Sequence, residues 1–497
     1  MRKIFTLIAA SMVSFAISAE AYVTAGDATV YTFADLAKIP ESGVTVKKNT
    51  QTYTVANNIE IAATDGLVLE DGDVIKLGDA VEIVIYGDAD FTPRSWALIT
   101  RTDDTVTPKG LYIRDNGNIE MRNVVIEYAQ VRSFATTSHW FENCTFRYCQ
   151  TKGSSTGAIA INNSTESTEP TGVINCRFIE CVSAAIGQGA TTSHPMVIQN
   201  CYFYHNDTSN ANRPQINITN PGKSGHIIMG NMIIGATETK KSGGIAISDL
   251  VGSNGGGIAI VQNNTIFNCR YGLTFQSASS IEASIKDNSL TYNCNETNAN
   301  NGGSGISIYG KVKVYGEGNL IEGNLWGVTI LGASEGVNFG KIDDPTAEDY
   351  NPGRNIFKSN GNGGTDYDFY NNSSNAITCY AQGNVWNVAE QDSVSVSKVV
   401  WDKYDNAALG EVIFTMPSAA SSNVASITQT SNDFTYDAAA CEVKATVAAP
   451  ITVYSMSGVV AKMSSSPVAA LKVDELVAGV YVARNESTGH TVKFAKE

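Results

Sequence analysis

The residues that could do chemistry in this chain are mostly neutral. Short segments alternate apolar and polar residues with period two, and their polar members are hydroxyls and amides. If the apolar members point inward, the polar members project together on one outer face. Amides and hydroxyls there can bind a sugar by hydrogen bonds, and tyrosine rings among them can stack on its apolar face. We therefore expect a carbohydrate-binding face that contains Gln215, Asn217, Ser248, Thr274, Gln276, Ser307, Tyr309 and Tyr370.

This face carries neither a carboxylate nor a histidine. Hydrolysis of a glycosidic bond normally needs two carboxyl groups at a set separation. Elimination from a uronate needs a base together with charge stabilisation, often from Ca²⁺. Neither pattern occurs at matching positions of successive segments. We therefore favour a protein that binds glycan or mediates surface contact without an evident catalytic constellation, and we keep a polysaccharide lyase or glycoside hydrolase as the alternative.

Acidic residues gather instead in the longest insertion, residues 332–353. Asp343 and Asp344 are its weak candidates for a metal site, because carboxylate oxygens are the ligands that Ca²⁺ prefers. A solvated acidic loop is the favoured explanation. We expect no cofactor, with Ca²⁺ as the possible exception. A zinc site is not expected, because no C-x-x-C pair accompanies the cysteines.

The elements that must position the polar face belong to a repeat of about thirty residues. Each repeat has a slot that holds Asn or Cys, with a large apolar residue two positions later. Such a period predicts one supersecondary unit per repeat, stacked on its neighbours. The slot residues are Asn123, Cys144, Cys176, Cys201, Asn231, Asn264, Asn288, Asn319, Asn355 and Asn384, and the apolar followers begin with Val125, Phe146 and Phe178.

Three short apolar segments per repeat predict three strands and three turns per coil, which is an all-β parallel β-helix. Asn in the slot suits a sharp turn, because it tolerates left-handed backbone and its side chain can bond the next coil. A leucine-rich solenoid is the rival, but it needs a helical stretch in each repeat, and the sequence shows none. In a stack of this kind, equivalent residues lie about 4.8 Å apart and form columns.

Nine cysteines can be interpreted in two ways. Cys144, Cys176 and Cys201 share the slot, while Cys149 and Cys181 share the position five residues later. The favoured interpretation is columns of buried thiols that pack as small hydrophobic residues. The column spacing also falls within the Cα range of a disulfide, so one or more bridges stay open.

The ends and the charge predict the compartment and exclude some partners. Residues 1–21 combine an early positive charge, an apolar stretch and a small-x-small site, as in a cleaved signal peptide, so we expect a secreted or cell-surface protein. No other apolar run is long enough for a membrane span. A net charge of −15 argues against nucleic acid, and it disfavours a strongly anionic polysaccharide unless basic residues cluster locally. The expected partner is a polysaccharide or cell-surface glycan.

Changes in composition divide the mature chain. Residues 22–417 are predicted to form the β-helix with an N-terminal cap, because the end of a stack would otherwise expose an open strand edge. Residues 418–432 are rich in Ser, Ala, Asn and Thr and are typical of a linker. Residues 433–497 are predicted to form a small C-terminal β-sandwich-like domain.

Two resemblances accompany these patterns. The Asn-Cys-Thr-Phe and Asn-Asn-Thr-Ile strings, and the Trp386…Asp402…Asp405…Val412…Pro417 pattern, resemble the right-handed parallel β-helix superfamily that includes pectate lyases. This resemblance implies the fold and a polysaccharide-related role, but no particular activity. The tail, with residues 451–458, Leu476, residues 478–481 and residues 492–494, resembles the C-terminal sorting domain of the type IX secretion pathway of Bacteroidetes. The Pro-Asn-Pro start often seen in that family is absent, so a cell-surface β-sandwich is the alternative.

Overall fold

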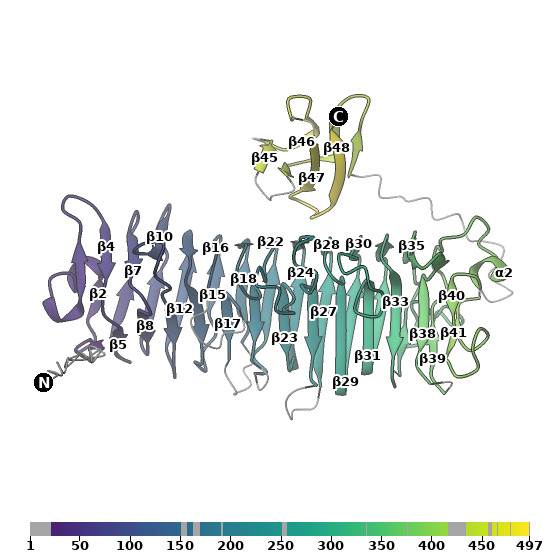
Figure 1. The fold of residues 1–497 in the computed structure, drawn as a ribbon, viewed down its shortest axis with the longest axis horizontal. Helices are drawn as coiled ribbons and strands as arrows, with labels where there is room; N and C mark the ends of the chain where they lie inside the picture. Colours follow the sequence, from purple (N-terminus) through teal and green to yellow (C-terminus); the bar gives the residue numbers. More distant parts are fainter. Residues whose placement is uncertain are drawn as a thin grey trace, which may run out of the picture.

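In the computed structural model, strands of successive coils pair in parallel and stack along one axis (Figure 1). This arrangement confirms the predicted all-β parallel β-helix. Two of its three faces join into a 26-stranded sheet and the third is a 13-stranded sheet. The structure describes residues 21–150, 157–162, 169–189, 192–250, 256–333, 335–374, 376–415, 434–455, 460–464, 466–477 and 479–496.

The first face is made by one strand from each coil, paired in parallel with the next. Two long strands, β29 and β31, bend and continue from the first face into the second. The first-face strands are β1 (Tyr22–Val23), β5 (Ile59–Ile61), β8 (Glu82–Ile85), β11 (Gly110–Ile113), β14 (Gln130–Ser133), β17 (Ile159–Ile161), β20 (Ile186–Gln188), β23 (Ile216–Thr219), β26 (Ile245–Ser248), β29 (Leu273–Lys286), β31 (Ser304–Glu317), β33 (Trp326–Leu331), β38 (Phe369–Asn372) and β40 (Val400–Trp401).

The second and third faces complete each coil. The second face contains β2 (Val30–Thr32), β6 (Gly66–Val68), β9 (Asp88–Phe91), β12 (Asn118–Arg122), β15 (Trp140–Glu142), β18 (Thr171–Ile174), β21 (Met196–Gln199), β24 (Gly222–Met229), β27 (Gly257–Gln262), the second halves of β29 and β31, β34 (Val337–Asn338), β39 (Thr378–Tyr380) and β41 (Glu411–Ile413). The third face contains β3 (Val44–Val46), β4 (Thr52–Val55), β7 (Val74–Leu77), β10 (Ala97–Arg101), β13 (Val124–Glu127), β16 (Thr145–Arg147), β19 (Arg177–Ile179), β22 (Tyr202–Tyr204), β25 (Met232–Ile234), β28 (Thr265–Phe267), β30 (Ser289–Thr291), β32 (Leu320–Glu322) and β35 (Ile356–Lys358).

A short helix, α1 (Phe33–Leu36), packs on the first coil together with the 3₁₀ turn η1 (Pro40–Ser42). Its N-terminus is fixed by a capping box, in which the Thr32 hydroxyl accepts from the Asp35 amide and the Asp35 carboxylate accepts from the Thr32 amide. Phe33 and Leu36 are fully buried against the core. This arrangement places apolar cover on the open end of the stack, as the predicted N-terminal cap requires.

From Cys144 to Asn355 the slot residues lie in one buried column, and each bonds the preceding coil. Asn264 Nδ2 donates to the Ile228 carbonyl at 2.9 Å, and Asn264 Oδ1 accepts from the Asn231 amide at 3.0 Å. The slot cysteines repeat the first of these bonds, since the Cys201 thiol donates to the Val173 carbonyl at 3.2 Å. Cys can therefore replace Asn in the slot, because both side chains donate a hydrogen bond to the carbonyl at the same position of the preceding coil.

Two details of the predicted slot are wrong. Val125 pairs with Thr145, so the residue opposite Cys144 is Val124, and Asn123 is not in the column. The left-handed residue is also not the slot itself but the one before it, as at Asn123 and Asn143, with φ values of 56° and 55°. The slot side chain is needed for the hydrogen bond between coils, and its neighbour makes the turn.

A second column lies five residues beyond the slot. Asn324 Nδ2 donates to the Leu290 carbonyl at 3.0 Å and to Asn360 Oδ1 at 3.1 Å. The column ends on the buried carboxyl of Asp368, which accepts from Asn360 Nδ2 at 3.1 Å. Burial raises the pKa of Asp368 to about 6.

All nine cysteines lie in described ranges and are free thiols, so the structure agrees with thiol columns rather than bridges. Cys144, Cys176 and Cys201 are buried in successive coils. Burial raises the pKa of the Cys144 and Cys176 thiols well above the usual value. These thiols are therefore protonated donors rather than nucleophiles.

The tail folds into two antiparallel sheets around a separate hydrophobic cluster that includes Val443, Ile451, Val453 and Phe494. Residues 418–432, the predicted linker, lie outside the described residues, as do residues 1–20 of the predicted signal peptide. One sheet contains β42 (Phe434–Asp437), β43 (Glu442–Ala449) and β46 (Val468–Lys472), and the other contains β45 (Val460–Met463), β44 (Ile451–Ser455), β47 (Gly479–Asn485) and β48 (Thr491–Lys496).

A buried polar network interrupts the apolar interior of the central coils. His139 Nε2 lies 2.7 Å from Ser133 Oγ, and His194 Nε2 lies 2.9 Å from Thr171 Oγ1. Burial lowers the pKa of His139 to about 3 and that of His194 to about 4. His226 follows in a later coil, and burial lowers its pKa to about 4. The folded protein therefore holds these imidazoles neutral.

We expect the change Asn264→Ala to lower the free energy of unfolding by roughly 3 kcal/mol. The Ile228 carbonyl and the Asn231 amide would each lose a buried partner, at about 1–3 kcal/mol apiece. The thermal unfolding midpoint, followed by circular dichroism, measures the effect. The matched control is Asn263→Gly, because Asn263 has a φ of 56°, where glycine fits without strain. Equal midpoints for the two variants would contradict the role of the slot.

We expect the change His226→Met to weaken the loss of stability in acid. A histidine with a depressed folded pKa protonates first in the unfolded chain, so it contributes stability above pH 6.5 that is lost as pH falls towards 4. Each such group contributes a slope of about 1.4 kcal/mol per pH unit in that window. Asp73 and Asp368, whose pKa values are raised to about 6, act in the opposite direction, so the readout is the difference between variant and wild type. Parallel stability curves between pH 4 and 6.5 would rule this out.

Candidate functional site

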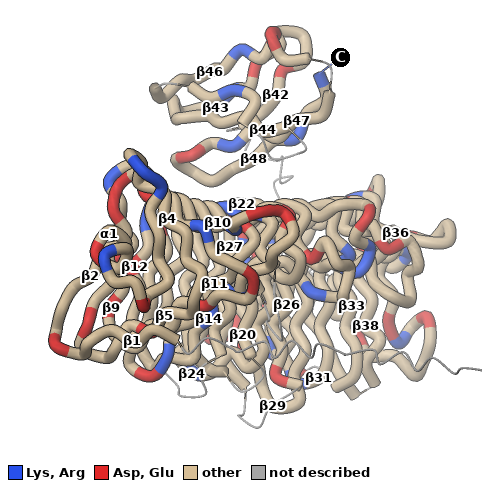
Figure 2. The backbone as a smooth tube through the Cα atoms, turned by 60° about the vertical axis from the view of Figure 1, so that its left-hand side comes forward, with Lys and Arg blue, Asp and Glu red and all other residues tan. Residues whose placement is uncertain are grey.

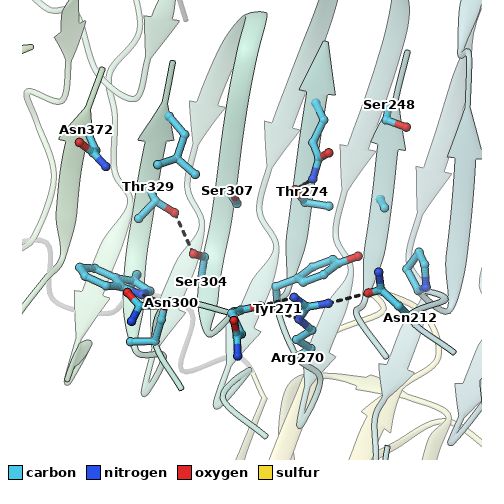
Figure 3. Close-up of a pocket in the computed structure, with 18 of the residues that line it drawn as sticks. Asn212, Ser248, Arg270, Tyr271, Thr274, Asn300, Ser304, Ser307, Thr329 and Asn372 are labelled. Carbon is cyan, nitrogen blue, oxygen red and sulfur yellow. Dashed lines mark hydrogen bonds between the residues drawn. The ribbon is translucent and has the colours of Figure 1, made fainter. Parts of the chain in front are cut away.

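The first face carries a cleft of about 590 Å³ over strands β23 to β38 (Figure 3). Its floor is formed by outward side chains of these strands, and one wall is formed by the loops that lead into them. Because the strands pair in register, residues far apart in sequence stand side by side at roughly 4.8 Å. The row along the floor is Asn217, Ala246, Thr274, Ser307, Thr329 and Tyr370, and the row beyond it is Ser248, Gln276, Tyr309, Leu331 and Asn372.

The structure brings most of the predicted binding residues together in this cleft. They come from consecutive coils and share one face, as the period-two alternation predicts. Their common position does not test whether they bind a glycan, and that role stays a prediction. The predicted residues that line the cleft are Asn217, Ser248, Thr274, Gln276, Ser307 and Tyr370.

Two predicted residues lie elsewhere. Gln215 is fully buried, and its Oε1 accepts from Asn206 Nδ2 at 2.7 Å, so its expected outward projection is wrong. The reason is its place just before β23, where the chain is still turning and strand alternation does not hold. Tyr309 is 45% exposed and stands between Gln276 and Leu331 in register, but it does not line the cleft.

The wall of the cleft is built around Arg270. Its Nε donates to the Asn301 carbonyl at 2.7 Å, and its Nη1 donates to Asn212 Oδ1 at 2.5 Å (Figure 3). At the other end of the same loop, Trp326 Nε1 donates to the Ala299 carbonyl at 2.9 Å. The loop around residues 299–301 is thus held at both ends by side chains that also face the cleft.

Aromatic rings close one end of the cleft. The ring of Trp326 stacks on Tyr370 at 5.4 Å between centroids with an 18° tilt, and Tyr367 lies 4.5 Å from Trp326. Trp401 continues the group at 5.2 Å from Tyr367. Rings at such distances support one another, so they form a firm apolar platform beside the polar floor.

Glycines at the start of the cleft strands let the wall approach the floor. A Cβ atom on Gly272 would meet the carbonyl oxygen of Gly305 in the next coil at 2.5 Å. A Cβ atom on Gly327 would overlap the carbonyl oxygen of Asp368. Because only glycine fits such close crossings, the chain can turn sharply out of the sheet there and place Arg270 and Trp326 above the floor.

The electrostatics of the cleft are simple. Arg270 is the one charged residue among the described lining residues, and no described carboxylate pairs with it. Burial raises the pKa of the Tyr271 hydroxyl, and it also raises that of Tyr370, so both stay protonated and able to donate. Figure 2 shows that Lys, Arg, Asp and Glu occupy only short stretches of the coils. The cleft can therefore supply many hydrogen bonds, one positive charge and a stacking platform.

The sequence patterns did not indicate Arg270 and Trp326 as cleft residues. Alternation counted back from the inward Val328 places Trp326 inward, but Trp326 is the first residue of β33, where alternation does not hold, and it lines the cleft. Arg270 directly follows Cys269, which is buried in the second column. The sequence could therefore have indicated that the Arg270 side chain points out of the core. Nothing in the spacing, however, could show that the two side chains hold one loop.

A second cleft, of about 850 Å³, lies on the second face beside the insertion of residues 332–353. It contains the carboxylates that the first cleft lacks. Glu282 pairs with Lys313 at 3.2 Å, and Asp349 pairs with Lys341 at 2.5 Å. The exposed Glu348 also lines it. Two of its three acids are therefore paired with lysines.

The weak metal candidates are both exposed. Asp344 accepts from the amide and hydroxyl of Thr346, at 2.9 and 2.7 Å, and Asp343 accepts from Gln382 Nε2 at 3.1 Å. Throughout the described ranges, no three His, Cys, Asp or Glu side chains are grouped as they would be around a metal ion. Calcium binding by this loop stays a prediction.

Comparison with known proteins adds little to the assignment. No family model and no curated protein matches the sequence. A solved structure, the periplasmic alginate epimerase AlgG, is 12% identical, and the likeness covers 78% of this chain and 84% of that chain with a TM-score of 0.34. The fold assignment rests instead on the coil register. Where the chain is described, none of its helices has the length and apolarity of a membrane span.

Proposed function

We propose that the first cleft binds a glycan chain laid across the coils. Asn217 at one end and Tyr370 at the other are five coil spacings apart, or roughly 24 Å. The observation that carries the proposal is that rows of uncharged amides and hydroxyls meet the Trp326–Tyr370 ring pair in one cleft. Sugars present hydroxyls at their edges and C–H groups on their faces, and this cleft complements both.

Arg270 adds one directed contact to this surface. Its guanidinium is fixed by Asn212 and Asn301, so little conformational entropy is lost when a ligand binds it. A single acidic substituent on an otherwise neutral sugar would suit this charge. A polymer with an acid on every residue suits it less, because the chain as a whole carries a charge of −15.

The proposed setting is outside the cell or at its surface, as the signal-peptide pattern of residues 1–21 indicates. The proposed partner is a polysaccharide or cell-surface glycan. Binding needs no cofactor in this proposal, because the contacts come from the side chains themselves. A dependence on Ca²⁺ would point to the loop that contains Asp343 and Asp344.

We expect the change Trp326→Ala to weaken glycan binding about tenfold, because a lost stacking contact is worth roughly 1–1.5 kcal/mol. A glycan array identifies the ligand, and isothermal titration calorimetry on the full chain then measures the dissociation constant. The matched control is Trp96→Ala, which removes a 47% exposed tryptophan from another part of the surface. Tyr370→Phe keeps the stacked ring and removes only the hydroxyl, so it should weaken binding less than Trp326→Ala does. Equal affinities for both tryptophan variants would refute binding at this platform.

The competing function, a polysaccharide lyase or glycoside hydrolase, draws its support from the second cleft. There Glu282, Glu348 and Asp349 flank one hollow together with the Tyr315 ring. Lysine partners at 3.2 and 2.5 Å neutralise two of these acids, which does not favour a general acid that must carry a proton. We therefore rank catalysis second.

We expect no turnover when the protein is incubated with a polysaccharide panel, with and without Ca²⁺, in reducing-sugar and unsaturated-uronate assays. The physical reason is that the described lining of the first cleft has no carboxylate, and that two of the three carboxylates in the second are paired with lysines. Turnover that disappears in Glu282→Gln or Glu348→Gln, but persists in Trp326→Ala, would replace the binding function with catalysis in the second cleft.

A further inference from the structure

The third face breaks the strand alternation in a few neighbouring coils. A sheet with one face in water normally alternates apolar inward and polar outward residues. In β22, β25 and β28 the inward residues Phe203, Ile233 and Ile266 belong to the main core, as expected. Four of the six outward residues of the same strands are also apolar and buried, and they form a cluster of their own, whereas Tyr204 and Thr265 are half-buried. We call this cluster the docking strip, and its members are Tyr202, Met232, Ile234 and Phe267.

Neighbouring coils carry ordinary outward residues at the same positions. On one side β19 presents Arg177 and Ile179, and on the other β30 presents Ser289 and Thr291. These side chains are half-buried, whereas the docking strip is 1–5% exposed. Outward apolar side chains of other coils, such as Leu320 and Ile356, are half-buried as well. Among the described residues of this face, full burial of outward apolar side chains is therefore confined to the coils that something covers.

The cover is the chain's own C-terminal sandwich, which lies over these coils in Figure 1. Its strands β44, β47 and β48 face the strip. The Tyr454 ring stacks on Tyr202 at 5.5 Å with a 13° tilt, and Val482 joins the apolar cluster. Lys493 Nζ lies 5.3 Å from the centroid of the Phe267 ring.

Polar contacts fix the position of the sandwich on the strip. Arg484 Nη2 donates to the Gly230 carbonyl at 2.7 Å, at the turn just before β25. Thr491 Oγ1 lies 2.8 Å from Thr265 Oγ1. Directed bonds of this kind at both ends of an apolar centre are typical of a specific interface rather than of chance contact.

We propose that the docking strip is a built receptor for the C-terminal sandwich, and that the sandwich stays bound to it without the covalent connection. A contiguous cluster of apolar residues would be a liability on an exposed sheet, so its position under the sandwich indicates that the covered state is the working state. The strip belongs to the third face and the first cleft to another face, so docking leaves the cleft open. This inference is independent of the proposed function.

The test places a protease site within residues 418–431 of the full chain and cuts the folded protein. We expect both fragments to elute together on gel filtration at micromolar concentration, with the mass of one chain by light scattering. Separation of the fragments at that concentration would overturn the proposal. A complex of twice the mass would also overturn it, because it would show that the strip pairs with a second copy.

The double variant Met232→Thr, Ile234→Thr gives the strip the residue type that Thr265 and Thr291 supply at the same two positions of later coils. We expect the cut fragments of this variant to bind at least about tenfold more weakly, since buried apolar anchors dominate such interfaces. Arg484→Met should act in the same direction. Lys444→Ala is the control, because Lys444 lies in the other sheet and pairs with Asp437.

Two further readouts separate a docking defect from a folding defect. The thermal midpoint of the β-helix should be unchanged in the threonine variant, because both side chains point away from the core. Glycan binding by the first cleft should be the same before and after cutting. If the threonine variant holds its cut fragment as tightly as the wild type does, the strip is not the receptor.

Discussion

From Cys144 to Asn355, each slot side chain donates a hydrogen bond to a backbone carbonyl of the preceding coil, three residues before the slot position of that coil. This bond fixes how one coil sits on the next. A shift by a single residue would turn every inward side chain of a strand outward, so the register must be defined coil by coil. The thiols of Cys144, Cys176 and Cys201 keep the same geometry at the N-terminal side, which is why the column continues where asparagine stops.

The cleft is a consequence of that register. Its floor has no local origin, because residues such as Asn217 and Thr274 are far apart in the chain and meet only through the stacking of coils. Its wall arises where glycines allow the chain to leave the sheet abruptly. The polar floor therefore follows the regular spacing of the β-helix coils. The wall, which includes Arg270 and Trp326, is formed only in a few coils and does not repeat.

Side chains depart from strand alternation in two regions of this β-helix, the buried polar network and the docking strip. Polar residues turn inward around His139 and His194, and apolar residues turn outward at Tyr202 and Phe267. A buried polar group is tolerated when it is hydrogen-bonded, and an outward apolar group is tolerated when it is covered. The first condition is met by the Ser133 and Thr171 hydroxyls, and the second by the C-terminal sandwich.

The sequence alone determined the β-helix architecture, the register of the coils from Cys144 onward and the shared face of six cleft residues. All three follow from the periodicity of the sequence. Its errors lie at element ends: Asn123 was placed one residue out of register, and Gln215 was placed outward although it is buried. At such positions the chain is turning, and alternation carries no information. Only the tertiary structure decided that Arg270 and Trp326 hold one loop as a wall, and that the tail covers Tyr202, Met232 and Phe267. Contacts between loops, and between separately folded parts, depend on positions in space that no local pattern encodes.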